Sequence, residues 1–171
     1  VCEAQAGQDL RLFLNDADGA LLGSFHRIDA ALAPRKLAFA MNAGMYHADR
    51  SPVGLYIEEG QQAARLVTSA GPGNFGMRPN GVFCIRPDGR FAILESRAFA
   101  QNPPDCRFAT QSGPMLVIGG DLHPRFLPES DSRYTRNGVG VSADGRRALF
   151  VISDVRVTFH QIARFFRDGL G

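Results

Sequence analysis

Residues 109–141 read ATQSGPMLVIGGDLHPRFLPESDSRYTRNGVGV, and they concentrate glycines, hydroxyls, amides and arginines between two apolar runs. The first part, TQSGP (110–114), is polar and turn-forming, and it leads into the apolar run 115–118. This order predicts short hydrogen-bonding side chains at the mouth of a strand. A second apolar run, 138–141, predicts another strand at the far end. The stretch therefore predicts the floor of a site.

Three arginines, Arg125, Arg133 and Arg136, lie in the loop before the second strand, together with Glu129 and Asp131. A guanidinium presents a fixed fork of donors that matches a phosphate or a carboxylate, so this composition suits an anion clamp. The alternative is a solvated loop in which the arginines pair with the two carboxylates at the surface. Both interpretations stay open at this point.

Length and composition exclude several classes of protein. The chain has 171 residues, 44% of them hydrophobic and 21% charged, which suits one domain with a sizeable core. A net charge of +2, without a basic stripe interleaved with aromatics, argues against a nucleic-acid partner. No apolar run approaches the length of a membrane span.

The cysteines and histidines show no metal-binding spacing, so we expect neither a metal nor another cofactor. Cys2, Cys84 and Cys106 form no CxxC pair, and their odd number leaves at least one unpaired within this chain. One disulfide in an exported protein and buried inert thiols are both compatible with this pattern.

Hairpins dominate the chain. Residues 82–94 and 138–152 each hold an Asp-Gly turn between apolar runs, and residues 52–67 predict a third hairpin. Helical spacing with a capping residue at the start predicts helices over 24–33 and near the end of the chain, from residue 158. Together these elements predict a single α+β domain over residues 1–171, with a mostly antiparallel or mixed sheet and two or more helices packed on it.

Two further side chains stand at predicted strand ends. Asn42 follows the apolar run 37–41, and Asp154 follows the apolar run 148–152. Neighbouring apolar groups would partly desolvate such a carboxylate, which suits a catalytic acid or base. The alternatives are turn chemistry for Asn42 and a turn or cap for Asp154. The Gly- and Pro-rich loop 71–81 predicts a cover over a ligand, but its glycines form no nucleotide-binding motif.

Five segments in order resemble the phosphodiester glycosidase family, the group related to the lysosomal uncovering enzyme that removes N-acetylglucosamine from a sugar-1-phosphodiester. The resemblance covers nearly the whole chain from Asp9 and is greatest to the bacterial, exported branch. It implies a periplasmic or extracellular location. The segments are FAMNAGMY (39–46), SPVGLYIEEG (51–60), GPGNFGMRPNGVF (71–83), TQSGPMLV (110–117) and RYTRNGVGVSADGR (133–146).

The resemblance also carries the family's site motifs onto numbered positions here. They fall on Asn42, Gly44, Tyr46, Gly113, Pro114, Arg136 and Asp154. Members of the family continue past the final helix into an apolar strand that ends in Asp-Gly-Gly or Asp-Gly-Ser, whereas this sequence stops at Gly171. The resemblance therefore implies that a core strand and part of the site come from further polypeptide, or that the domain is a truncated form.

The implied activity is hydrolysis of a sugar-1-phosphodiester, a small molecule or glycan, to free sugar and a phosphomonoester. Because phosphate is a good leaving group, such a site depends little on a strong general acid. It needs hydrogen-bond donors to the phosphate, a carboxylate, and polar groups that bind the sugar. We predict Asp154 and Arg136 as catalytic residues. The predicted substrate-binding residues are Asn42, Gly44, Arg78, Asn80, Thr110, Gln111, Ser112, Gly113, Arg133 and Asn137. The alternatives are a non-catalytic domain that binds glycans or glycophosphates, and a phosphodiesterase on the same scaffold.

Overall fold

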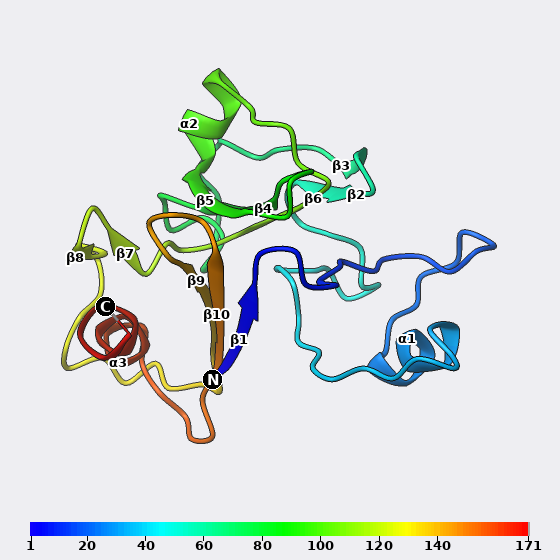
Figure 1. Cartoon of the computed structure of the whole chain (residues 1–171). Helices are drawn as coiled ribbons and strands as arrows, with labels where there is room; N and C mark the ends of the chain where they lie inside the picture. Colours follow the sequence, from blue (N-terminus) through cyan, green and yellow to red (C-terminus); the bar gives the residue numbers. More distant parts are fainter. Residues whose placement is uncertain (171) are drawn as a thin grey trace.

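The structure is a computed structural model that describes residues 1–170. Its centre is a five-stranded antiparallel sheet in the order β3-β2-β6-β4-β5, and a three-stranded antiparallel sheet, β1-β10-β9, lies beside it (Figure 1). The strands of the central sheet are β2 (Tyr56–Glu58), β3 (Gln61–Ala64), β4 (Gly81–Ile85), β5 (Phe91–Glu95) and β6 (Phe108–Ser112). Those of the second sheet are β1 (Cys2–Gln5), β9 (Asn137–Val141) and β10 (Arg147–Ile152).

The remaining elements are short. β7 (Val117–Ile118) pairs with β8 (Asp121–Leu122), and the helices are α1 (Phe25–Ala31), α2 (Ser96–Gln101), α3 (Phe159–Arg164) and the π-helical turn η1 (Phe165–Gly169) that continues α3. The predicted α+β class with hairpin-built sheets is confirmed. None of the helices within residues 1–170 has the length and apolarity that crossing a bilayer requires.

The side chains of β4 explain why the central sheet is buried on both faces. Successive side chains of a strand point to opposite faces. Phe83 and Ile85 join a core cluster with Phe150 of β10, so the three-stranded sheet covers this face. Val82 and Cys84 join a second cluster to which α2 contributes. The sheet is thus held between β10 on one face and α2 on the other.

A disulfide fixes the segment that precedes β6. Cys84 of β4 is bonded to Cys106, with their Cα atoms 5.6 Å apart, whereas Cys2 is exposed and unpaired within the described chain. The sequence left open a disulfide or buried free thiols, and the structure contains the disulfide.

The sequence predicted the hairpins and the helix caps correctly. The β2-β3, β4-β5 and β9-β10 hairpins are present, Ser24 caps α1, and Thr158 and Gln161 form the capping box of α3.

Three local predictions, one of a turn and two of strands, differ from the structure. Residues 110–112 belong to β6 and not to a turn, because the segment pairs with β2 on one side and β4 on the other. Residues 37–41 pair in neither sheet, and only 117–118 of the apolar run 115–118 form a strand.

Candidate active site

The alternation along β6 separates the predicted polar residues into two groups. Thr110 and Ser112 point to the same face as Phe108 and line a large cavity, whereas Gln111 points to the opposite face. The Gln111 amide accepts from the N–H groups of Leu55 and Val67 and donates to the Val67 carbonyl and the Ser96 hydroxyl. All its hydrogen-bonding capacity is therefore used inside the fold.

The cavity has a volume of about 1250 Å³ and is bounded by the ends of β4 and β6, by β9 and by η1. This volume is above the roughly 300–1,000 Å³ of most small-ligand sites, so the cavity has room for a ligand. It gathers, from segments far apart in the sequence, the following predicted site residues: Asn42, Gly44, Thr110, Ser112, Gly113, Arg136 and Asn137.

Close backbone contacts hold the segment 42–46 against β6. A Cβ atom on Gly44 would come within 2.5 Å of the Thr110 hydroxyl oxygen and 3.0 Å of the Gln111 carbonyl oxygen, so glycine is required here. On the other side, Asn137 Nδ2 donates to the Asn42 carbonyl at 3.4 Å. The start of β9 and the 42–46 segment therefore form one wall of the cavity.

The Arg136 guanidinium is the most distinctive group in this wall. Arg136 is only 8% exposed. Its Nε donates to the Val157 carbonyl at 2.9 Å, and its Nη2 donates to the Ser132 carbonyl at 3.0 Å. Nη1 makes no hydrogen bond to residues 1–170, and no carboxylate among them lies within ion-pair distance of the guanidinium. Burial lowers the pKa of Arg136 from its usual value.

A stack of rings positions this guanidinium. Arg136 lies 3.6 Å from the Phe159 ring centroid, Phe159 stacks on Phe126 at 5.1 Å, and Phe126 stacks on His123 at 4.7 Å. His123 is buried, and because its Nδ1 accepts from the Arg125 N–H, its Nε2 donates to the Arg78 carbonyl. Sequence reasoning missed these positioning residues, although Phe159 lies in the helix that was predicted from residue 158.

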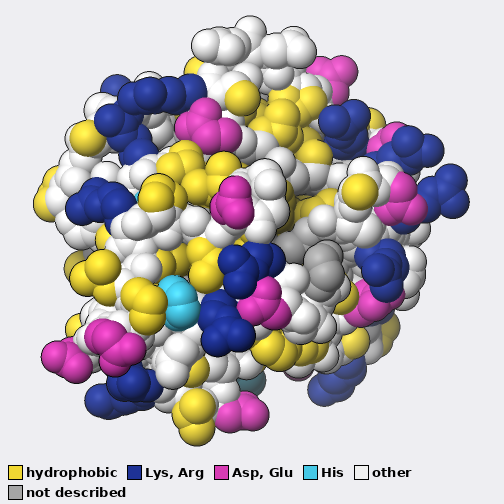
Figure 2. Space-filling model, turned by 90° about the vertical axis from the view of Figure 1, so that its left-hand side faces the viewer, with side chains coloured by type: hydrophobic (Ala, Val, Ile, Leu, Met, Phe, Trp, Pro, Cys, Tyr) yellow, Lys and Arg dark blue, Asp and Glu magenta, His cyan; other side chains and the backbone are white. Residues whose placement is uncertain are grey.

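Most charged side chains that line the cavity are arginines, and three of them pair with carboxylates outside the lining: Arg90 with Asp88, Arg147 with Glu3 and Arg167 with Asp168. Arg86, Arg90, Arg147 and Arg167 also line the cavity, and Asp144 is the one Asp or Glu of the described residues that does. Asp144 is exposed in the β9-β10 turn, where the Ser142 hydroxyl and the Arg146 N–H lower its pKa. Elsewhere on the face that carries α3, basic side chains are interspersed with acidic and apolar ones (Figure 2).

Five predicted site residues lie outside the cavity lining: Arg78, Asn80, Gln111, Arg133 and Asp154. Arg78 donates to the Thr68 carbonyl, and Arg133 donates to Gln161. Asn80 is buried and donates to the Phe75 carbonyl, while its Oδ1 has no partner within residues 1–170.

Asp154 lies on an exposed bend after β10. The desolvation expected for a carboxylate at a strand end is therefore absent. Instead Ser153 faces inward, and its hydroxyl accepts from the Arg136 N–H at 3.0 Å.

Metal-ligating side chains do not gather anywhere in residues 1–170: no three His, Cys, Asp or Glu residues are placed to hold one ion. The cavity lining does combine a buried cation that has a free donor with amides and hydroxyls from other segments.

Comparison with known proteins identifies the family. A sequence model of the family described as phosphodiester glycosidase matches residues 35–171. The chain is also 37% identical over 162 residues to the uncharacterized protein YigE of Escherichia coli (strain K12), across 94% of this chain and 63% of the relative. It thus spans less than two thirds of that relative's length. Since the family match extends over most of the chain, the protein belongs to the phosphodiester glycosidase family.

Proposed function

We propose that the cavity beside Arg136 binds the phosphate of a sugar-1-phosphodiester and that the protein hydrolyses the glycosidic bond to release free sugar and a phosphomonoester. One observation carries this proposal: Arg136, which lines the cavity, is buried and has no carboxylate partner in residues 1–170. An unpaired buried cation is costly, and a phosphate in the cavity would complete its coordination at Nη1.

The surrounding side chains suit the rest of such a substrate. The amides of Asn42 and Asn137 and the hydroxyls of Thr110 and Ser112 line the same cavity and can bind sugar or phosphate oxygens. In the reaction, water adds to the anomeric carbon while the bond from that carbon to the phosphate oxygen breaks. Arg136 stabilises the negative charge that develops on the departing phosphate, so a strong general acid is not needed.

The carboxylate that takes the water proton is the least constrained part of this proposal. Asp154, predicted from the sequence, lies outside the cavity lining, whereas Asp144 lies at its exposed rim. The replacement Asp154→Asn tests the prediction. Loss of turnover with unchanged phosphomonoester binding supports the assignment, and unchanged turnover removes Asp154 from the catalytic set.

A second candidate function, reversible binding of a sugar phosphodiester, is favoured by the scarcity of acidic groups in the described cavity, where only Asp144 is found. Incubation with a UDP-sugar and identification of both products separates the alternatives. Free sugar with a phosphomonoester supports the glycosidase, sugar phosphate indicates a phosphodiesterase, and tight binding without product indicates a binding domain.

We further propose an exported, periplasmic or extracellular location. The Cys84–Cys106 disulfide supports it, because disulfides persist in oxidising compartments. Alkylation of free thiols at the moment of cell lysis, followed by mass spectrometry, tests this. Protected Cys84 and Cys106 are expected, and alkylation of both in the mature protein would contradict the location.

A further inference from the structure

We infer that a second, apolar cavity holds the hydrocarbon chain of the alcohol on the phosphate, so that the preferred phosphodiester carries a long alkyl or isoprenoid group. This inference rests on the proposed function, because it takes the ligand of the adjoining polar cavity to be a sugar-1-phosphodiester. The cavity has a volume of about 460 Å³ and lies between the N-terminal segment, α1 and the edge of the core.

Apolar side chains make up most of its wall. They come from the N-terminal segment, from α1 and from residues 37–41, and include Leu10, Leu14, Phe25, Ile28, Leu37 and Phe39. Helix α1 lies apart from both sheets in Figure 1 and has no buried residue. Phe25 is 48% exposed although it lines the cavity. The apolar face of α1 is thus turned to an open hollow in place of a packed core.

The two cavities adjoin. Residues 41–46 line both, and so do Thr110 and Val139. Asn42 and Gly44 are among these shared residues, and Asn137, the neighbour of Arg136, donates to the Asn42 carbonyl. A phosphodiester bound at this shared lining can therefore direct one ester group into the polar cavity and the other across the 41–46 segment into the apolar one.

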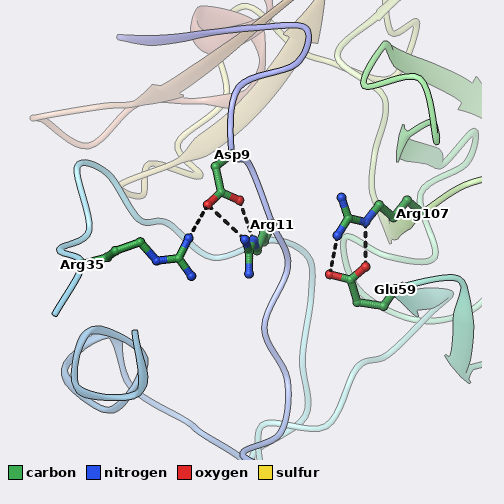
Figure 3. A network of polar contacts seen from close by, with 5 residues as sticks. All are labelled: Asp9, Arg11, Arg35, Glu59 and Arg107. Carbon is green, nitrogen blue, oxygen red and sulfur yellow. Dashed lines mark hydrogen bonds and ion pairs between the residues drawn. The ribbon is translucent and has the colours of Figure 1, made fainter. Parts of the chain in front are cut away.

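The charges of the apolar cavity suit an anionic amphiphile. Arg11 and Arg50 line it, and no Asp or Glu of the described residues does. Arg11 is bound to Asp9, which also accepts from Arg35, so its charge is compensated (Figure 3). Arg50 stacks on Tyr46 at 4.8 Å and has no ion-pair partner within residues 1–170.

A sugar would fit the apolar part of this cavity poorly. The Ser24 hydroxyl caps α1 by accepting from the Arg27 N–H, and the Tyr56 hydroxyl donates to Glu58. Apart from Arg50, and from Asn42 and Thr110 at the boundary with the polar cavity, few polar side chains remain to pair with sugar hydroxyls, and buried unpaired hydroxyls are unfavourable. A hydrocarbon chain needs no such partners and gains from burial.

The test compares sugar-1-phosphate esters of methanol, butanol and octanol. We expect KM to fall about fourfold for each methylene that the cavity buries. Phe25→Ser and Ile28→Ser should flatten this dependence. Phe165→Ser is the matched control, since Phe165 is similarly exposed, at 43%, but lines neither cavity. Thermal melts of all three variants establish that they are folded.

Calorimetry with octyl phosphate and methyl phosphate measures chain binding without hydrolysis. Tighter binding of octyl phosphate that is lost in Phe25→Ser supports the inference, even if no ester is hydrolysed and the proposed function fails. Hydrolysis of all esters with equal KM, together with equal binding of both phosphates, overturns the inference and leaves the proposed function standing. A chain-length dependence that Phe25→Ser and Phe165→Ser change equally also overturns it.

Discussion

Among the individual residues, Arg136 combines a structural and a proposed binding role. Two of its nitrogens donate to the Val157 and Ser132 carbonyls, while the third has no hydrogen-bond partner in residues 1–170. A lysine keeps the charge but cannot make this fork of hydrogen bonds. Replacement by lysine therefore separates the effect of geometry from that of charge.

For Arg136→Lys we expect phosphomonoester binding to weaken by roughly 10- to 100-fold, the equivalent of one lost charged hydrogen bond. Isothermal titration calorimetry with the phosphomonoester product measures this. Arg156→Gln is the control, because Arg156 is exposed nearby and does not line the cavity. Equal affinities of the two variants would show that Arg136 does not bind the phosphate.

Substitution of Gly44 tests how closely the segment between the two cavities packs against β6. The Gly44→Ala methyl group would collide with Thr110, so we expect a loss of about 1–3 kcal/mol in the free energy of unfolding and a displaced 42–46 segment. Urea denaturation measures the loss. Gly71→Ala is the control, since a Cβ there meets no atom within 4 Å. A Gly44→Ala variant as stable as Gly71→Ala would contradict the close packing of this segment on β6.

Thr110, Gln111 and Ser112 show where residue-level reasoning from the sequence fails. Their polar character predicted one shared role, but β6 sends Gln111 to the α2 side and the other two to the cavity. The alternation would have revealed this if the segment had been recognised as a strand. Its polar residues and the following Gly-Pro favoured a turn because the pairing of β6 with β2 and β4 is not encoded locally.

At the scale of elements, the disulfide joins β4 to the segment that leads into β6. Closing this loop restricts the unfolded chain, so Cys84→Ala with Cys106→Ala should lower the free energy of unfolding by about 2–4 kcal/mol. Thermal melts with and without reductant provide the measurement. As the control, Cys2→Ala should leave the melting temperature unchanged. A double variant with the same melting temperature as the parent protein would contradict a stabilising crosslink.

The turn η1 predicts a specific pH dependence. Hydrogen bonds from Arg167 and then Arg164 lower the pKa of Asp168 from 3.8 to about 2. Because the pKa of the folded state is the lower one, these contacts stabilise η1 above about pH 4, and this contribution is lost as the pH falls toward 2. Carboxyl NMR titration should give this pKa and show it rising in Arg167→Ala but not in Arg97→Ala. A value near 3.8 in the parent would contradict the contacts.

Hairpins and capped helices were predictable because their signals are local. An Asp-Gly turn or a Thr-x-x-Gln capping box acts within a few residues, and both appear where expected. β1 was not predicted because it forms only by pairing with β10, almost the whole length of the chain away. The Glu95 side chain caps the N-terminus of α2, and Phe99 of this helix is buried on the face of the sheet that carries the disulfide.

For the molecule as a whole, the central sheet, the second sheet and the terminal helix form one cavity from segments that span residues 41–170. Four of the five segments that carry the family resemblance contribute residues to the lining of this cavity, and segment 51–60 does not. The resemblance did not distinguish side chains that line the cavity, such as Asn42 and Arg136, from those used inside the fold, such as Gln111 and Asn80. That distinction depends on strand direction and burial, which the motifs do not carry.

The central claim is that this cavity directs cleavage to the bond between the sugar and the phosphate. The most direct measurement is hydrolysis of a sugar-1-phosphodiester in water enriched in oxygen-18, with mass analysis of both products. Attack at the anomeric carbon places the label in the free sugar, and this is the predicted result. Label in the phosphate would mean cleavage of the phosphorus–oxygen bond and contradict the account, as would the absence of any product.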